Sequence, residues 1–197
     1  NKYRLLVVSL LCTVNLTAQV SSSLVAGEKY KGNSFPLFND ATVASICIDE
    51  SDAKVVTIAA QAFAEDVKLV SGKRMDVLNA IPGKGFSIVA GTIGQSKLID
   101  ELIRSNKLKV SSIESGWERF IIQTIGNKLV IAGSDRRGTA FGIFHLSRAM
   151  GVSPFVWWAD VTPAKKKQLY VSGTYVSSEP SVKYRGIFIN DEDWGLF

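Results

Sequence analysis

The sequence predicts an α/β fold in which helices cover a mixed sheet of four or five strands. Two observations lead to this prediction. Short apolar runs with strand character alternate with longer segments in which apolar residues recur at helical spacing. The 197 residues are also 46% hydrophobic and 21% charged, which is typical of a globular chain with a core and not of a disordered one.

The first strand and helix are expected between residues 41 and 72. The run ATVASICID at 41–49 is largely apolar, as in a strand inside a sheet. From 55 to 70, apolar side chains recur on one helical face. Ser51 or Asp52 is expected to cap the start of this helix, and Gly72 is expected to end it.

A second strand and helix are expected at 85–92 and 95–105, and a β-hairpin follows at 118–134. The two β-rich runs of the hairpin meet at Gly126 and Asn127, and two-residue links of this kind form tight turns. Because strands and helices alternate before the hairpin, the two crossovers are expected to be right-handed.

A third helix is expected at 136–150, with Ile143, Leu146 and Met150 facing the core and a glycine ending it. His145, the only histidine of the chain, lies on this helix between apolar neighbours. The chain offers no second histidine for a zinc site and no adjacent cysteine for a nucleophile–base pair. A half-buried structural histidine is therefore the favoured interpretation.

Composition and structure-breaking residues divide the chain into parts. Residues 19–40 are rich in Ser, Gly and Asn with little periodicity, and they are expected to form a leader. The α/β domain is expected at 41–178, with its last strand at 168–176. Glu179 and Pro180 then interrupt the chain before a final strand.

The first 18 residues have the three-part plan of a secretory signal peptide. Lys2 and Arg4 precede a ten-residue apolar run, Leu5 to Val14, and a polar stretch that reaches Ala18. The run is too short for a membrane-spanning helix, which needs about 20 such residues. Cleavage is expected after Ala18, so the protein is expected to be secreted or periplasmic.

The two cysteines predict neither a disulfide nor a metal site. Cys12 lies within the apolar run after Leu10 and Leu11, where a lipoprotein signal would place small residues, so lipid anchoring is disfavoured. If the signal peptide is removed, Cys47 is alone and is expected to be a small buried hydrophobe.

The charge distribution does not indicate a nucleic-acid partner. The net charge is +5, and no basic stripe alternates with aromatic residues. The run Lys165–Lys167 is expected to be a solvated loop, with contact to an acidic polymer as the alternative. No cofactor is expected.

The glycines in GKGFSIVAGTIGQS allow a phosphate-binding loop, because a strand leads through Gly91 and Gly94 to a helix N-terminus. The spacing matches neither a dinucleotide fingerprint nor a P-loop. A tight strand-to-helix turn is therefore favoured.

Two local features point to a site. Trp157 and Trp158 lie in the connecting segment VSPFVWWAD, where they would either fill a domain interface, the favoured interpretation, or stack on sugars. The chain then closes with YRGIFINDEDWGLF, in which the apolar run 186–189 precedes Asp191 and Glu192. At the carboxyl end of a strand, such polar groups are typical of a (β/α)₈ barrel site, whereas a solvated acidic tail is the alternative.

Four stretches resemble the N-terminal part of glycoside hydrolase family 115, the xylan α-1,2-glucuronidases. They are VAGTIGQSKLIDELI (89–103), GWERFIIQTI (116–125), LVIAGSDRRGTAFGIFHLSRAMGVSPFVWWADV (129–161) and PSVKYRGIFINDED (180–193). The last of these stretches also resembles the linker into the barrel of β-N-acetylhexosaminidases. The resemblance implies that residues 179–197 form a linker and the first strand of a truncated catalytic barrel.

The same resemblance implies the function of the full-length enzyme. It would remove glucuronic acid or its 4-O-methyl form from glucuronoxylan by inversion, and a homodimer is one oligomeric state that it allows. No metal is expected, because this chain lacks the residues for a metal site. Asn190 and Glu192 would line the sugar site, and Asp191 would take part in catalysis. Because most of the barrel is missing, this chain is expected to be inactive alone. The alternatives are a stand-alone carbohydrate-binding or scaffolding module and the N-terminal domain of a hexosaminidase-like enzyme.

Overall fold

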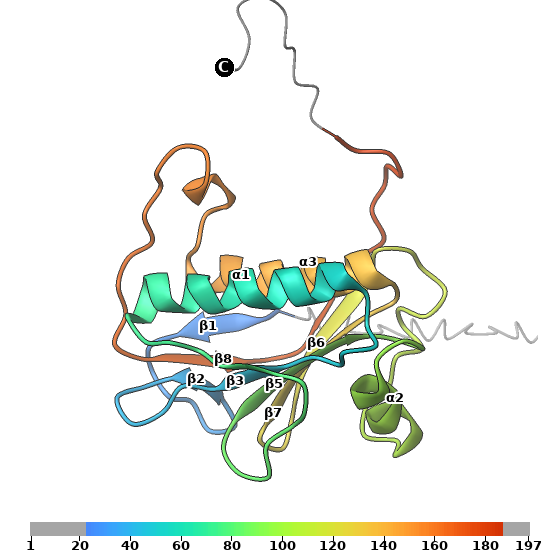
Figure 1. Cartoon of the computed structure of the whole chain (residues 1–197), viewed down its shortest axis with the longest axis horizontal. Coiled ribbons are helices and arrows are strands. Elements are labelled where there is room, and N and C mark those ends of the chain that lie inside the picture. The colour runs from blue at the N-terminus through green and yellow to red at the C-terminus, as the bar shows by residue number, and fades with distance from the viewer. Residues whose placement is uncertain (1–22, 187–197) are drawn as a thin grey trace, which may run out of the picture.

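The computed structural model describes residues 23–186 and shows a sheet with helices on both faces (Figure 1). Helices α1 (Lys54–Ser71) and α3 (Arg136–Met150) lie side by side on one face, and α2 (Lys97–Arg104) lies on the other. The predicted signal peptide, Cys12, the final strand and its acids lie outside the described residues. None of the helices in the described part is both long and apolar enough to cross a membrane.

The main sheet has six strands in the order β4-β3-β5-β7-β6-β9. The first four strands are parallel to one another, and β6 runs antiparallel to both of its neighbours. The prediction of a mixed sheet is confirmed, but the predicted four or five strands are too few, because β4 is a two-residue strand without a periodic signal. The strands are β3 (Ser45–Cys47), β4 (Val77–Leu78), β5 (Ser87–Thr92), β6 (Phe120–Ile125), β7 (Lys128–Gly133) and β9 (Tyr175–Val176).

A second sheet of three strands was not predicted. Its order is β1-β8-β2, and β1 (Val25–Gly27) and β2 (Phe35–Phe38) both lie in the segment expected to be a leader. β8 (Leu169–Ser172) and β9 were expected to be one strand. They separate at Gly173, whose φ is +90° and where an added Cβ would lie 2.3 Å from the carbonyl oxygen of Ser23. That glycine redirects the chain from one sheet to the other.

Both faces of the main sheet are buried, because alternate residues of its central strands point to opposite sides. On β5, Ile88 and Ala90 join the cluster under α1 and α3, whereas Val89 joins the cluster under α2. The predicted inward residues of α3 are fully buried. Two covered faces explain why these strands read as continuous apolar runs rather than alternating ones.

The hairpin prediction is confirmed. β6 and β7 pair in register from Ile125–Lys128 to Phe120–Gly133. Gly126 has a φ of +59°, whereas Asn127 is not in the positive-φ region. Positive φ at the first turn position alone is the type II′ pattern, whose twist suits a two-residue hairpin.

The predicted cap of α1 is wrong at its start and right at its end. Neither predicted residue is the N-cap, because Ala53 holds that position without a side-chain cap. The Asp52 carboxylate instead accepts a hydrogen bond from the backbone N–H of Thr92 at 2.7 Å, which ties the helix start to β5. Gly72 ends α1 with a φ of +74°.

The lysine run after the third helix also has a structural role. The Lys165 ammonium donates to the Leu69 carbonyl at 2.6 Å, and the Lys166 ammonium donates to the Met150 carbonyl at 2.8 Å. These carbonyls belong to the last turns of α1 and α3, where cations interact favourably with the helix dipole. The contacts support the loop interpretation of the run.

Candidate functional site

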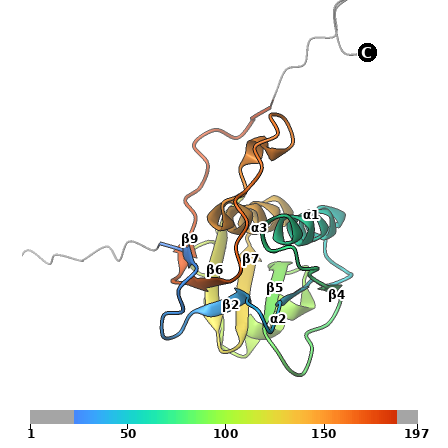
Figure 2. The same cartoon turned by 90° about the vertical axis from the view of Figure 1, so that its left-hand side faces the viewer.

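A cavity lies over the outer face of α3. Its volume is about 610 Å³. Phe144 and His145 of α3 line it, as do Pro154 and Trp157 of one projecting loop and Arg185 of the segment after β9. Both segments extend beyond the helix layer, one in orange and one in red (Figures 1 and 2). The helix and the two segments thus enclose a mainly apolar hollow.

A buried carboxyl group lies in the wall of this cavity. Asp66 of α1 is 6% exposed, and its carboxylate accepts a hydrogen bond from the Ser147 hydroxyl at 2.6 Å. Burial raises the pKa of Asp66, and the bond from Ser147 only partly offsets the increase. The group thus favours its neutral form in the fold more than a solvated aspartate would.

An aromatic stack also lines this cavity. The ring of His145 stacks on Tyr175 of β9 with centroids 4.1 Å apart, and Tyr175 also stacks on Phe120 of β6. Burial and the neighbouring Arg148 lower the pKa of His145. The predicted half-buried structural histidine is confirmed by this position. Within residues 23–186, no three His, Cys, Asp or Glu side chains lie close enough together to hold a metal ion.

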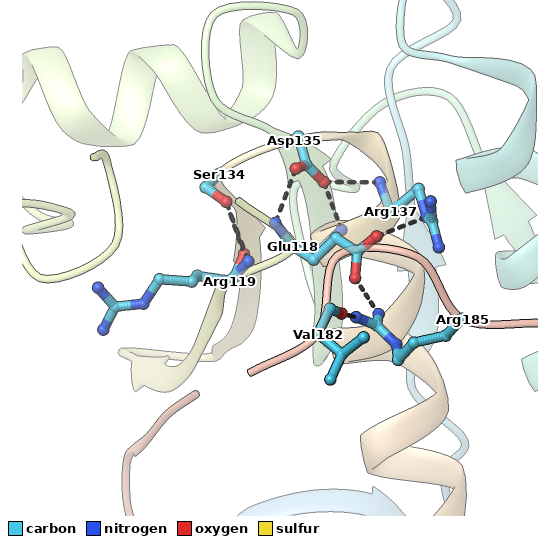
Figure 3. Close-up of polar contacts among 8 residues, drawn as sticks. Glu118, Arg119, Ser134, Asp135, Arg137, Val182 and Arg185 are labelled. Carbon is cyan, nitrogen blue, oxygen red and sulfur yellow. Dashed lines mark hydrogen bonds and ion pairs between the residues drawn. The ribbon is translucent and has the colours of Figure 1, made fainter. Parts of the chain in front are cut away.

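The rim of the cavity carries an almost fully buried acid between two arginines (Figure 3). Glu118 has a side chain that is 2% exposed, and its φ of +54° is unusual for a residue with a Cβ. The Arg137 guanidinium donates to its carboxylate at 2.8 Å, and the Arg185 guanidinium pairs with the other carboxylate oxygen. The negative charge of this buried acid is therefore compensated within the described chain.

Asp135 holds this cluster in position from the start of α3. Its carboxylate accepts hydrogen bonds from the backbone N–H groups of Arg137 and Gly138, which caps the helix. The second carboxylate oxygen accepts from the backbone N–H of Glu118 at 2.7 Å. The Asp135 side chain thus fixes both the start of α3 and the backbone of Glu118, which has a positive φ.

Arg185 connects the cluster to the point where the described chain ends. Besides its pair with Glu118, its guanidinium lies 5.5 Å from the ring centroid of Trp117 and 6.0 Å from that of Phe141. It also donates to the carbonyl of Val182. A cation placed between an acid and two aromatic rings anchors this segment on the domain.

These groups do not form a catalytic acid–base pair. Glu118 is neutralised by two cations, and Asp66 bonds to Ser147 below the surface. A glycosidase site requires one carboxylic acid and one free carboxylate that face the same substrate. Neither of these two acids is therefore a free carboxylate in this cavity.

Comparison with known proteins identifies the relatives of this fold. No family model matches the sequence, and no curated protein matches it. Among solved structures, the family GH115 4-O-methyl-α-glucuronidase BtGH115A, with specificity for decorated arabinogalactans, is 41% identical. The match covers 82% of this chain and 20% of that chain, with a TM-score of 0.72.

The chain belongs to glycoside hydrolase family 115 and corresponds to an N-terminal region of that family's proteins. It spans about a fifth of the length of that relative. Two other solved structures align at lower similarity. A Streptomyces plicatus β-hexosaminidase is 15% identical over 81% of this chain and 25% of that chain, with a TM-score of 0.45. CpGH84D is 15% identical over 77% of this chain and 22% of that chain, with a TM-score of 0.48.

The predicted site residues of this GH115 region have different outcomes. Trp157 and Trp158 are each 76% exposed in the described chain, at and beside the cavity. Asn190, Asp191 and Glu192 lie outside the described residues, so their assignment to the sugar site stays a prediction.

The glycine-rich segment is a turn and not a phosphate site. Gly94 has a φ of +74°, and its N–H donates to the Asp100 carboxylate at 2.9 Å. The N–H of Lys97 at the start of α2 donates to the Asp49 carboxylate at 2.7 Å. Carboxylates of the protein thus occupy the donors that a phosphate would need. Desolvation acts to raise the pKa of Asp49, but hydrogen bonds from Ser51 and Lys97 together lower it. The predicted turn is confirmed.

Sequence reasoning missed the acid–arginine cluster and the buried Asp66. The signal that could have found the cluster was the dense charge in GWERF and SDRRG, where a capping aspartate opens a helix beside two arginines. Nothing in the sequence around Asp66 distinguishes it from Glu65, the exposed acid beside it in the same helix.

Proposed function

We propose that the full-length protein is a glycoside hydrolase that removes glucuronic acid or 4-O-methylglucuronic acid from polysaccharide side chains. One observation carries this proposal: the 41% identity to a 4-O-methyl-α-glucuronidase over 82% of the chain. The uronic acid is the shared element of that activity and of the family resemblance. The polysaccharide is glucuronoxylan in our proposal, and the relative's specificity makes decorated arabinogalactan the second candidate.

The proposed reaction proceeds with inversion. A general acid protonates the leaving oxygen while a carboxylate base activates water on the opposite face, with the two groups about 6.5–9.5 Å apart. We assign Asp191 to catalysis and Asn190 and Glu192 to substrate binding. The second carboxyl group belongs to the rest of the barrel, which takes on the order of 250 residues. This chain alone is therefore expected to be inactive.

The test uses the full-length protein on glucuronoxylan and, separately, on decorated arabinogalactan. We expect release of the uronic acid, with the β-anomer appearing first in ¹H NMR because an α-linkage is inverted. Asp191→Asn should lower the rate by about 10²–10⁴, the usual contribution of a proton-transferring group. Release of the α-anomer would reject inversion, and activity only on a β-N-acetylhexosaminide would favour the hexosaminidase alternative.

Secretion and quaternary structure belong to the same proposal. N-terminal sequencing of the exported protein should show cleavage after Ala18. Light scattering of the full-length protein distinguishes a monomer from the homodimer that the family resemblance allows.

A stand-alone carbohydrate-binding module is a second candidate, favoured by the exposure of Trp157 and Trp158. Exposed indole rings can stack on the apolar face of a pyranose, and alanine at both positions would then abolish retention on xylan in affinity electrophoresis. Tyr30, which is 63% exposed away from this cavity, provides the control substitution Tyr30→Ala. Unchanged retention in the double variant would reject the module.

A further inference from the structure

We propose that a groove beside the small sheet is a second binding site, for a polysaccharide that carries uronic acid. Tyr30, Tyr170 and Phe86 line this groove. The inference rests on the proposed function for the choice of polymer, and it adds a site apart from the cavity over α3. The two hollows have no lining residue in common.

The groove lies where the small sheet meets one end of the main sheet. Tyr30 belongs to the loop between β1 and β2, Tyr170 to β8, and Phe86 directly precedes β5. Gly126, in the turn of the β6–β7 hairpin, also lines the groove. Glu118 precedes β6 at the other end of this hairpin, whose six-residue strands are roughly 20 Å long. The groove and the acid–arginine cluster are therefore at opposite ends of the domain (Figure 1).

The aromatic rings of the groove are partly exposed and held at defined angles. Tyr30 is 63% exposed and meets the half-buried Tyr170 edge to face, with ring centroids 5.5 Å apart. Phe86 is 39% exposed and packs in the same way on the buried Phe35 at 5.8 Å. Stacking on the apolar face of a pyranose needs exposed rings whose orientation is already set. The volume of the groove, about 620 Å³, is also within the range of ligand sites.

Polar groups between the rings can bond to the hydroxyl groups of a sugar. The side-chain amides of Asn33 and Asn39 line the groove. The Asn39 carbonyl oxygen accepts bonds from Ala41 and Thr42, whereas its NH₂ group donates to no partner within residues 23–186. A wall that combines rings with hydrogen-bonding groups suits a sugar better than a protein partner, because protein interfaces have apolar centres.

Two lysines give the groove a preference for acidic ligands. Lys29 and Lys31 line a smaller hollow of about 220 Å³ that continues the groove, since Ser34 and Tyr170 line both. Neither lysine forms an ion pair with a residue of the described part. Glu28 lines the same hollow, so the two lysines leave one surplus positive charge. Ammonium groups beside an aromatic pair complement the carboxylate of a uronic acid.

The loop that carries these lysines is fixed in position by its own hydrogen bonds. The Ser34 hydroxyl accepts from the backbone N–H of Lys31 at 3.1 Å, and the N–H of Ser34 donates to the Lys31 carbonyl at 2.8 Å. The Gln168 amide donates to the Glu28 carbonyl at 2.9 Å, which ties the loop to the start of β8. A loop ordered in this way loses little conformational entropy when a ligand binds.

Affinity electrophoresis of this chain tests the site, with mobility normalised to a gel without polymer. We expect retardation by glucuronoxylan and by decorated arabinogalactan, and the stronger of the two identifies the polymer. Glucuronoxylan whose carboxyl groups have been reduced to alcohols should retard the chain less. Tyr30→Ala should weaken binding about tenfold. The double variant Lys29→Gln/Lys31→Gln should weaken it about fivefold, and only on the acidic polymers.

Matched controls remove the same groups at the far end of the domain. Tyr184 is 85% exposed and Lys183 is exposed beside it, so Tyr184→Ala and Lys183→Gln should bind like the parent. Tyr30→Ala should keep the urea midpoint of the parent, which separates lost binding from lost folding. Alanine at Trp157 and Trp158 should leave retention unchanged, which is opposite to the result expected of the stand-alone module.

Four results would overturn the proposal. Parental binding by both Tyr30→Ala and the lysine variant would reject the site. An equal loss in Lys183→Gln would show non-specific attraction to a basic chain. Equal retardation by the reduced polymer would exclude recognition of the uronic acid. A dimer in light scattering that Tyr30→Ala dissociates would assign the groove to a second copy.

The test also separates this site from the proposed function, because retention is measured without turnover. If this chain is retained but the full-length protein releases no uronic acid, the proposed function is rejected and the site is kept. If the full-length protein releases uronic acid but this chain is not retained, the site alone is rejected.

Discussion

Replacing Glu118 tests whether the acid–arginine cluster stabilises the fold and whether its backbone is strained. Removing one partner of a fully buried ion pair costs about 3–5 kcal/mol. The arginine side chains here are 52% and 37% exposed, so water can solvate them once the acid is gone. We therefore expect Glu118→Ala to lower the free energy of unfolding by about 2 kcal/mol, which is nearer the loss of one or two charge-assisted hydrogen bonds.

A glycine at the same position separates strain from the ion pairs. Glu118→Gly removes the same carboxylate, but glycine adopts a φ of +54° without the steric cost that alanine pays. Glu118→Gly should therefore be about 1 kcal/mol more stable than Glu118→Ala, despite the greater freedom of glycine in the unfolded chain.

Urea unfolding followed by circular dichroism measures these differences, with the slope of the transition compared between variants. Glu65→Ala is the control, because the Lys68–Glu65 pair is 60% and 70% exposed and should contribute under about 1 kcal/mol. In a thermal scan, Glu118→Ala should melt about 4–8 °C lower, at about 2–4 °C per kcal/mol for this chain length. The reasoning fails if Glu118→Ala is as stable as the control, or if glycine is worse than alanine.

Three other predictions concern buried positions. Burial raises the pKa of Asp66 above its unfolded value, so the stability it contributes is fully present below the unfolded pKa and falls as pH rises through the folded pKa. Asp66→Asn should thus melt higher than the parent at pH 7 but not at pH 3, and the same shift at both pH values would contradict this. Burial also raises the pKa of the Cys47 thiol. In a Cys12→Ser variant, a thiol reagent should therefore label Cys47 only as fast as the protein unfolds. Rapid labelling of the native protein would show that Cys47 is accessible. Alanine at Gly138 would place its Cβ 2.3 Å from the carbonyl oxygen of Arg119, the residue before β6. At Gly142 the nearest atom is a side-chain carbon of Ile131, at 2.6 Å. Both should lose stability in urea despite the helix preference for alanine, Gly138→Ala by about 2 kcal/mol or more and Gly142→Ala by less, and the reverse order would refute the backbone contact as the cause.

The elements that the sequence predicted correctly are those with a strong local signal. The periodicity of 54–71 and 136–150 and the Gly126-Asn127 turn each act within a few residues, and the structure contains all three. The short strands were missed because two to four residues have no detectable period, and because β1 and β2 are strands only through pairing with β8. The prediction that residues 19–40 form a leader without strands was wrong, because β1 and β2 lie within them.

The sequence by itself determined the helices, the hairpin, the buried strands and the resemblance to family 115. Only the tertiary structure decided that Glu118 meets Arg185, which lies 67 residues further along the chain, and that Asp66 lies beside Ser147 in the wall of a cavity. Periodicity and turn chemistry are properties of neighbouring residues, so they can be read along the chain. The pairing of distant charges depends on how the packed layers close, and that closure brings residues from α1, α3 and the final segment to one surface.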